Sequence, residues 1–147
     1  MRALLRVDAT VDVPAERLWE RLVDWPAQGE WVPLTRVRTV GGSGRGIGGR
    51  LEAWTGIGPI GFDDPMVITR WEPPYSCEVL HTGQLVRGEA GFDVVAIGPS
   101  RSRVAWWESL ELPLGRVGGL GWRLTAPLWH VLLRRALDRF RVLAESG

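Results

Sequence analysis

The chain of 147 residues contains no lysine, and all 18 of its basic residues are arginine. Lysine makes the phosphate contact of a P-loop, the Schiff base of many enzymes and the ATP contact of a kinase, so these three kinds of site are excluded. Asparagine is also missing, which excludes N-glycosylation. The single cysteine, Cys77, allows no internal disulfide and no cysteine-rich zinc site.

Long apolar runs are missing as well. No run approaches the roughly 20 residues that span a bilayer, and no signal-peptide pattern opens the chain. The net charge of +1 gives no reason to expect a nucleic acid or an anionic membrane as a partner. Hydrophobic residues make up 45% and charged residues 24%, as in an ordinary folded domain. We therefore expect one domain over residues 1–147, in the cytoplasm, without a membrane span or a nucleic-acid partner.

Tryptophan is in excess, with nine residues, and this number predicts a large aromatic interior or a cavity wall. Trp19 and Trp129 fall on apolar helix stripes, where we expect them in the core. Trp106 and Trp107 are neighbours on one predicted strand, so they face opposite sides of the sheet. An outward Trp107 needs cover from a loop or from a second copy, which leaves a homodimer possible. The candidates for lining or plugging a cavity are Trp54, Trp71 and Trp122.

The C-terminal segment predicts a long helix over residues 124–144. Its apolar residues follow the 3.6-residue period of a single stripe, with Pro127 near the start. The opposite face is polar and includes His130, which we expect to be exposed. Such a helix needs a broad apolar surface to cover its stripe. The stripe consists of Trp129, Leu132, Leu133, Ala136, Leu137, Phe140, Leu143 and Ala144.

Most of the remaining chain predicts strands. Residues 3–11 alternate between apolar and polar, and a helix follows from Pro14, with a second short helix before Trp31. From residue 34 the period is two, with Asp63, Asp64 and Pro65 interrupting one strand. Short turns between consecutive strands predict an antiparallel meander and an α+β fold. The strands of the meander are expected at residues 34–40, 50–55, 60–71, 76–82, 85–97 and 103–112.

This order of elements, together with local motifs, resembles the START-like or Bet v 1-like superfamily, which includes polyketide cyclases and lipid transport proteins. The motifs are residues 13–19 (VPAERLW) at the entry to the first helix, Asp24 followed by Trp31, the glycine-rich turn at residues 41–49, and residues 71–74 (WEPP). The resemblance implies a helix-grip fold. In this fold a seven-stranded curled antiparallel sheet surrounds the C-terminal helix, two short helices follow the first strand, and an apolar cavity remains inside.

The glycine-rich turn contains Gly44, Gly46 and Gly49 in the spacing G-x-G-x-x-G. A dinucleotide site needs a helix after this motif, but a strand is predicted from Arg50. The kinase version of the motif needs a lysine, which the chain lacks. A flexible hairpin that could act as a lid at the cavity mouth explains the turn better.

His81 and Glu108 are the polar residues predicted to lie on the inner face of the sheet. Burial of an isolated carboxyl group raises its pKa, which suits a general acid, and a neutral histidine can act as a base or orient a ligand carbonyl. For each residue an alternative without a functional role stays open. His81 could lie at a strand end in water, and Glu108 could pair with a buried arginine such as Arg38 or Arg70.

Two other charged groups favour structural explanations. Asp63 and Asp64 point to opposite sides of a strand and have no histidine near them in the sequence, so we expect a wet interruption of the strand and no metal site. Arginines gather near the C-terminal helix, but Asp138 and Glu145 dilute their charge, so a solvated helix face is favoured over a basic patch. These arginines are Arg101, Arg103, Arg134, Arg135, Arg139 and Arg141.

Three functions remain open, and none needs a cofactor. The first is binding of a small hydrophobic or aromatic ligand, with His81 and Glu108 orienting it. The second is polyketide cyclase or aromatase chemistry, in which the same two residues move protons. The third is a protein-interaction module with a filled core. The predicted cavity wall consists of Trp54, Phe92, Trp106, Leu132, Ala136 and Phe140.

Overall fold

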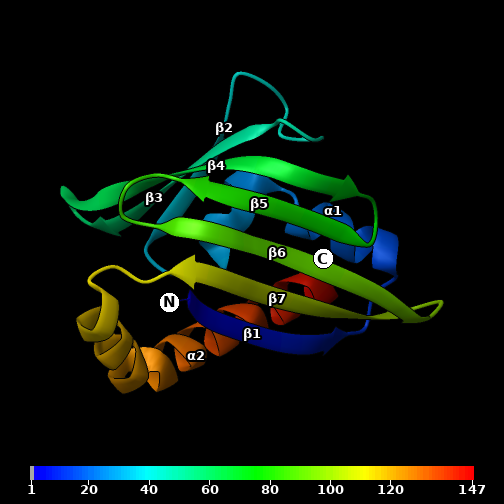
Figure 1. Cartoon of the computed structure of the whole chain (residues 1–147). Helices are drawn as coiled ribbons and strands as arrows, with labels where there is room; N and C mark the ends of the chain where they lie inside the picture. The colour runs from blue at the N-terminus through cyan, green and yellow to red at the C-terminus, as the bar shows by residue number, and fades with distance from the viewer. Residues whose placement is uncertain (1) are drawn as a thin grey trace.

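A computed structural model describes residues 2–147, and it consists of a seven-stranded sheet curled about a long C-terminal helix (Figure 1). Every neighbouring pair of strands is antiparallel, and the order across the sheet is β1-β7-β6-β5-β4-β3-β2. The predicted α+β helix-grip fold is confirmed. The elements in chain order are β1 (Arg2–Val11), α1 (Ala15–Leu22), the 3₁₀ helix η1 (Trp25–Glu30), β2 (Thr35–Val40), β3 (Arg50–Ile57), β4 (Ile60–Glu72), β5 (Ser76–Thr82), β6 (Arg87–Gly98), β7 (Arg101–Glu111) and α2 (Gly115–Ser146).

The two short helices carry the chain from one edge of the sheet to the other, since β1 and β2 are the edge strands. In α1, Leu18, Trp19 and Leu22 are buried, which is the spacing of one helix face. In η1 and just after it, Trp25 and Trp31 are each only 4% exposed. This connection therefore closes one end of the interior with aromatic rings.

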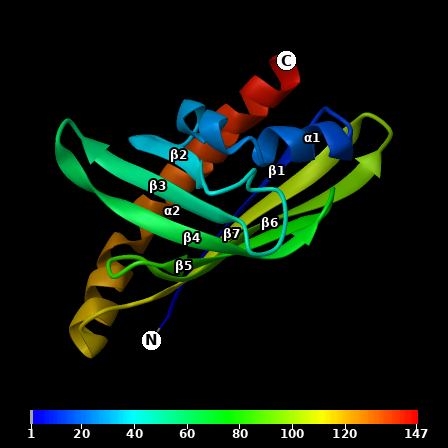
Figure 2. The same cartoon turned by 90° about the horizontal axis from the view of Figure 1, so that it is seen from above.

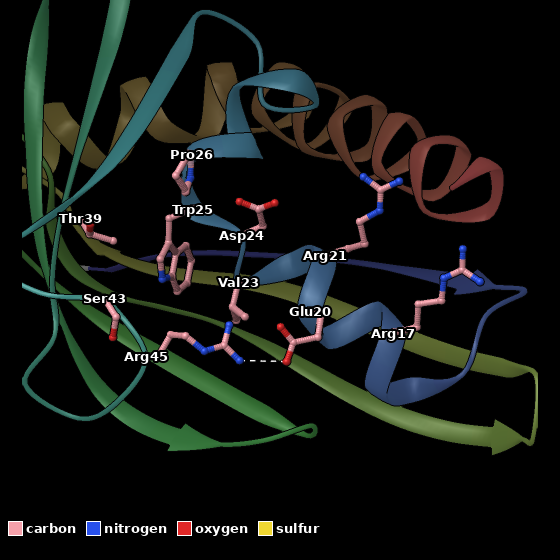
Figure 3. Close-up of a pocket in the computed structure, with 10 residues that line it drawn as sticks. All are labelled: Arg17, Glu20, Arg21, Val23, Asp24, Trp25, Pro26, Thr39, Ser43 and Arg45. Atoms are coloured by element: carbon pink, nitrogen blue, oxygen red, sulfur yellow. Dashed lines mark hydrogen bonds and ion pairs between the residues drawn. The ribbon is translucent and has the colours of Figure 1, made fainter.

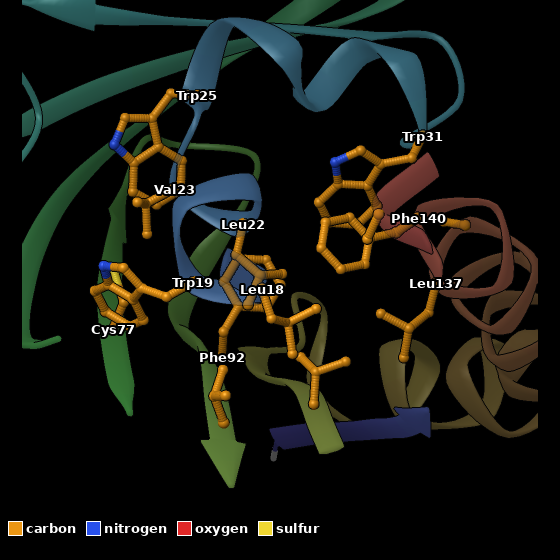
Figure 4. Close-up of a cluster of buried hydrophobic side chains, with 14 of the residues drawn as sticks. Leu18, Trp19, Leu22, Val23, Trp25, Trp31, Cys77, Phe92, Leu137 and Phe140 are labelled. Atoms are coloured by element: carbon orange, nitrogen blue, oxygen red, sulfur yellow. The ribbon is translucent and has the colours of Figure 1, made fainter. Parts of the chain in front are cut away.

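Aromatic contacts hold this end of the core together (Figure 4). The ring centroid of Trp31 lies 4.9 Å from that of Phe140 on α2 and 5.5 Å from that of Trp106 on β7. Trp19 meets Trp71 edge to face at 5.1 Å. As predicted, Trp19 is a core residue, with 1% of its surface exposed. These contacts fix η1 and α2 against the sheet.

The helix α2 is longer than predicted, because it begins at Gly115 and contains 32 residues. Pro127 consequently lies inside the helix and not near its start. Ala136, Leu137 and Phe140 in the C-terminal half are buried, whereas the first turns extend past the end of the sheet (Figures 1 and 2). Trp129 lies near this projecting part and is 47% exposed, so the expectation that it is a core residue was wrong.

Trp107 faces outward from β7, as expected, but it needs neither a loop nor a second copy for cover. Gly91 is its register partner on β6, and a Cβ atom at that position would lie 2.8 Å from the Trp107 ring. The missing side chain thus makes room for the indole on the outer face of the sheet, where Trp107 is half-buried. Among residues 2–147, no helix is both long enough and apolar enough to cross a bilayer.

Candidate functional site

A cavity of about 720 Å³ lies between the concave face of the sheet and α2. Side chains from all seven strands, from the η1–β2 connection and from α2 line it, and most of them are apolar. The cavity reaches the surface, because the lining residues Leu34, Leu85 and Trp129 are 60%, 73% and 47% exposed. Its volume falls within the range of small-molecule sites in proteins.

His81 on β5 is deeply buried in the cavity wall, with a side chain only 5% exposed. Its Nδ1 lies 2.8 Å from Oδ1 of Asp64 on β4, whose side chain is 14% exposed. The sheet register explains this contact, because His81 pairs with Met66, and Asp64 is two residues before Met66 on the same face. A carboxylate at Asp64 accepts the Nδ1–H hydrogen bond, which leaves Nε2 to face the other side.

Glu108 on β7 lies on that other side. Its Oε2 is 3.7 Å from Nε2 of His81, which is beyond hydrogen-bond distance, and Nε2 has no hydrogen-bond partner within residues 2–147. The two side chains come from strands on either side of β6. Between them lie Gly88, the partner of His81, and Ala90, the partner of Glu108. These are the two smallest residue types, so His81 and Glu108 can approach each other above β6.

The electrostatics of this cluster raise the pKa values of both Glu108 and His81 above their ordinary values. Burial raises the pKa of Glu108 to about 7, and the charge of Asp64 acts in the same direction, while the positive charge of a protonated His81 opposes the rise. Burial alone would lower the pKa of His81. The hydrogen bond and charge of Asp64, together with the charge of Glu108, outweigh burial and raise this pKa. His81 and Glu108 therefore titrate as a coupled pair.

The structure excludes the two structural alternatives, in which His81 lies in water and Glu108 pairs with a buried arginine. His81 is 7% exposed and not in water. The arginines that could have paired with Glu108 have other partners: Arg38 lies 3.1 Å from Glu52, and Arg70 pairs with Glu72 and Glu78. Among the described residues, no arginine forms an ion pair with Glu108, so its carboxyl group keeps the cost of burial.

Six of the eight residues predicted for the site line the cavity, and two do not. Trp54 lies on the outer face of β3, where the guanidinium of Arg36 is 4.9 Å from its ring centroid. This placement was missed because the inner face of β3 carries the residues on either side of it, Ala53 and Thr55. Phe140 is buried behind Trp31 and does not line the cavity. The predicted residues that line it are His81, Phe92, Trp106, Glu108, Leu132 and Ala136.

Two residues of the site were not predicted. The sequence predicts a solvent-exposed interruption of the strand at Asp63, Asp64 and Pro65. In the structure β4 runs through these residues without a break. The alternation of Phe62, Asp64 and Met66, which all line the cavity, was the signal that places Asp64 on the inner face. Trp31 also lines the cavity. It lies in the short connection after η1, where no period indicates which side chains face inward.

The glycine-rich turn does not cover the cavity mouth. None of residues 41–49 lines the cavity, and the turn folds back onto η1, where Nε1 of Trp25 donates a 2.8 Å hydrogen bond to the carbonyl oxygen of Gly44. Gly44 has φ +68°, and a side chain there would collide with the Trp25 ring. A strand follows the turn, so there is no helix N-terminus for a nucleotide phosphate.

A second hollow, of about 560 Å³, lies beside α1 and the glycine-rich turn (Figure 3). Its charged side chains are partly neutralised, because Nη2 of Arg45 lies 2.9 Å from Oε1 of Glu20. The arginines Arg17 and Arg21 line the same hollow. It contains no buried titratable group, so it offers less for chemistry than the cavity between the sheet and α2.

Two further kinds of site can be assessed directly. Burial raises the pKa of the Cys77 thiol to about 12, so it is not a nucleophile at neutral pH. Within residues 2–147, no group of three or more His, Cys, Asp and Glu side chains is arranged to hold a metal ion. The Asp64–His81–Glu108 group is therefore considered for proton chemistry and ligand recognition.

Solved structures of other proteins share this architecture. The Zhui aromatase/cyclase from Streptomyces sp. R1128 superposes with a TM-score of 0.77 at 14% identity, over 99% of this chain and 94% of that one. A START superfamily protein from Mycobacterium smegmatis gives a TM-score of 0.68 at 15% identity, over 97% and 94% of the two chains. The chain has the START-like fold.

A third match extends over the complete length of the other protein. The protein TTHA0849 of Thermus thermophilus gives a TM-score of 0.79 at 18% identity, over 99% of this chain and 100% of that one. No family model and no curated protein sequence matches the chain. Because the identities are below 20%, the structural likeness shows the START-like fold, and the function has to be argued from the cavity itself.

Proposed function

We propose that the protein binds a small, largely hydrophobic or aromatic ligand in the cavity between the sheet and α2. The observation that carries this proposal is a cavity of about 720 Å³ with a mostly apolar wall and one buried polar cluster. Apolar burial supplies the affinity, and a few placed polar groups supply the orientation. The open volume argues against a module with a filled core.

The polar cluster defines one feature of the ligand. Nε2 of His81 is buried and has no hydrogen-bond partner, which is costly unless a bound molecule supplies one. Glu108, 3.7 Å away, is protonated in part of the population at neutral pH, because its pKa is about 7. A ligand oxygen, such as a carbonyl or phenol oxygen, would pair with these two groups. The ligand is therefore an apolar molecule with at least one oxygen positioned to reach them.

A second candidate function is acid–base catalysis of the cyclase or aromatase type. Asp64 fixes His81 with Nε2 available as a base, and the protonated Glu108 can act as an acid. In an aldol closure, Nε2 of His81 would take a proton from the carbon between two carbonyl groups. The new carbon–carbon bond would then form as Glu108 gives its proton to the acceptor oxygen. Exchange with solvent through the open cavity mouth would then remove the proton from His81 and return one to Glu108.

Native mass spectrometry of the freshly purified protein tests the binding proposal. We expect a stoichiometric small hydrophobic adduct, or a thermal shift with a panel of fatty acids, flavones and aromatic polyketides. A clean apo mass with no shift across the panel would overturn the proposal in this form.

The variant Glu108→Gln separates the two functions. It keeps the shape of the side chain but removes the acid, so a molecule found to bind should still bind within a fewfold, while any conversion of it should be lost. Glu89→Gln is the matched control, because Glu89 lies on the neighbouring strand with its side chain exposed. Unchanged conversion in Glu108→Gln would exclude the catalytic role.

A further inference from the structure

The N-terminal half of α2 carries an exposed row of aliphatic side chains. Residues 117, 120, 124, 128 and 131 follow one another at intervals of three and four, which places them on one helix face. Their exposed fractions lie between 45% and 74%. Five contiguous aliphatic residues are more than the scattered exposure of an ordinary surface. We name these residues the apolar stripe: Val117, Leu120, Leu124, Leu128 and Val131.

No part of the molecule described by residues 2–147 covers this stripe. The first turns of α2 extend beyond the sheet, and the two views of the molecule agree on this (Figures 1 and 2). Four of the first seven residues of α2 are glycine, the poorest helix former after proline. A helix of this composition gains little stability from its own backbone in water. Its amphipathic order therefore points to an apolar surface against which it lies.

The charges beside the apolar stripe have one sign. No acidic residue occurs between Glu111 and Asp138. Arg116, Arg123 and His130 are all exposed and follow one another at intervals of seven, so they form a line along the helix beside the stripe. None of the ion pairs within residues 2–147 involves Arg116 or Arg123.

This charge pattern decides between two possible partners of the apolar stripe, a second copy of the chain and an anionic surface. If a second copy paired its stripe with this one across a two-fold axis, the two basic lines would approach each other with no carboxylate between them. An anionic surface matches the same line with opposite charge. Aliphatic residues on one side and arginines on the other, without acidic residues, are typical of a helix that lies in a membrane interface. No helix among residues 2–147 can span a bilayer, so such a contact stays at the surface.

We propose that the N-terminal half of α2 docks on an anionic lipid surface, with the apolar stripe in the lipid and with Arg116 and Arg123 at the phosphates. The opposite face of the same helix segment lines the cavity through Trp122 and Trp129. A docked α2 would therefore lie between the lipid surface and this part of the cavity wall. The proposal goes beyond ligand binding and does not depend on it, because the stripe residues do not line the cavity.

Co-sedimentation with lipid vesicles tests this proposal. The purified chain should sediment with vesicles of phosphatidylcholine mixed with phosphatidylglycerol, bind less to phosphatidylcholine alone, and be released by salt. Leu124→Glu combined with Leu128→Glu should weaken binding at least about tenfold, because two aliphatic groups no longer enter the lipid. Arg116→Gln combined with Arg123→Gln should remove the preference for the anionic vesicles.

Val142→Glu is the matched control. Val142 lies on the same helix and is 58% exposed, but it follows the charged residues that end the stripe, so this variant should bind like the parent chain. Absence of vesicle binding by the parent chain would overturn the proposal, and so would equal losses in the stripe and control variants. A dimer that dissociates in the stripe variant without any vesicle binding would overturn it too and assign the stripe to a second copy. Thermal shifts with the ligand panel should stay unchanged in the stripe variant, which separates a failure of docking from a failure of ligand binding.

Discussion

Glu108 is held in a position where its charged form is costly. Its side chain is 18% exposed, burial raises its pKa to about 7, and the nearest cation is His81 at 3.7 Å. The apparent pKa values belong to His81 and Glu108 as a pair, because the proton on one group changes the field felt by the other. The consequence at the residue scale is a folded state whose stability depends on pH near neutrality.

Glu108→Gln should make the free energy of unfolding less dependent on pH. The carboxyl group of Glu108 binds its proton more tightly in the folded chain than at its ordinary pKa of 4.5, so stability falls as pH rises from about 4.5 to about 7 and then levels off. The shift corresponds to at most roughly 3 kcal/mol, and Gln avoids this cost. Chemical denaturation from pH 4 to pH 8 measures the difference between the two proteins.

The variant and the parent chain should agree near pH 4 and differ most above pH 7. His81 contributes a pH effect of the same sign to both proteins, because its raised pKa also favours the protonated folded state. Glu89→Gln, on an exposed side chain, should leave the pH dependence unchanged. Parallel curves for Glu108→Gln and the parent chain would contradict the buried, uncompensated carboxyl group.

At the scale of elements, regular alternation predicted the sheet well. The strands, their antiparallel order and the inward positions of His81 and Glu108 follow from a period of two. Irregular segments were harder to predict. Asp64 lies in a segment whose sequence, Asp-Asp-Pro, is typical of a break in a strand. β4 nevertheless stays continuous because residues 63–65 pair with β3, and the pairing with β5 begins at Met66.

The start of α2 is the other element that the sequence did not reveal, and the reason is compositional. Four glycines in seven residues argue against a helix, and they outweigh the helical spacing of Val117, Leu120 and Leu124. Trp54 shows the same limit at a strand: alternation defines two faces, but a bulky residue alone does not indicate which face is inward.

Gly121→Ala should increase the helical content of the chain. A Cβ atom at Gly121 would meet no neighbouring atom within 4 Å, so alanine gains its helix propensity of about 1 kcal/mol without a clash. Far-UV circular dichroism should show a deeper helical band. Gly118→Ala is the paired control, because a Cβ there would collide with the carbonyl oxygen of Pro113. An equal gain in both variants would show that the start of α2 is not packed as described.

At the scale of the whole molecule, the curled sheet and α2 leave a volume that their side chains do not fill. The stable part of the core lies at one end, around Trp31, Phe140 and Trp19, and the cavity occupies the other. Ligand binding and stability therefore depend on different positions along α2. Ala136 lines the cavity, whereas Ala144, two turns later, is packed in the core at 1% exposure.

Ala136→Leu should abolish ligand binding without unfolding the protein, because its extra methyl groups enter open space. The stability of this variant should stay the same or rise, since apolar volume is filled without overpacking. The same substitution at Ala144 should cost about 1–3 kcal/mol, because that site has no room for a larger side chain. Thermal unfolding of both variants measures stability, and native mass spectrometry of both measures ligand binding. If Ala136→Leu is as destabilising as Ala144→Leu, the space beside Ala136 is not open, and the proposed ligand site is not there.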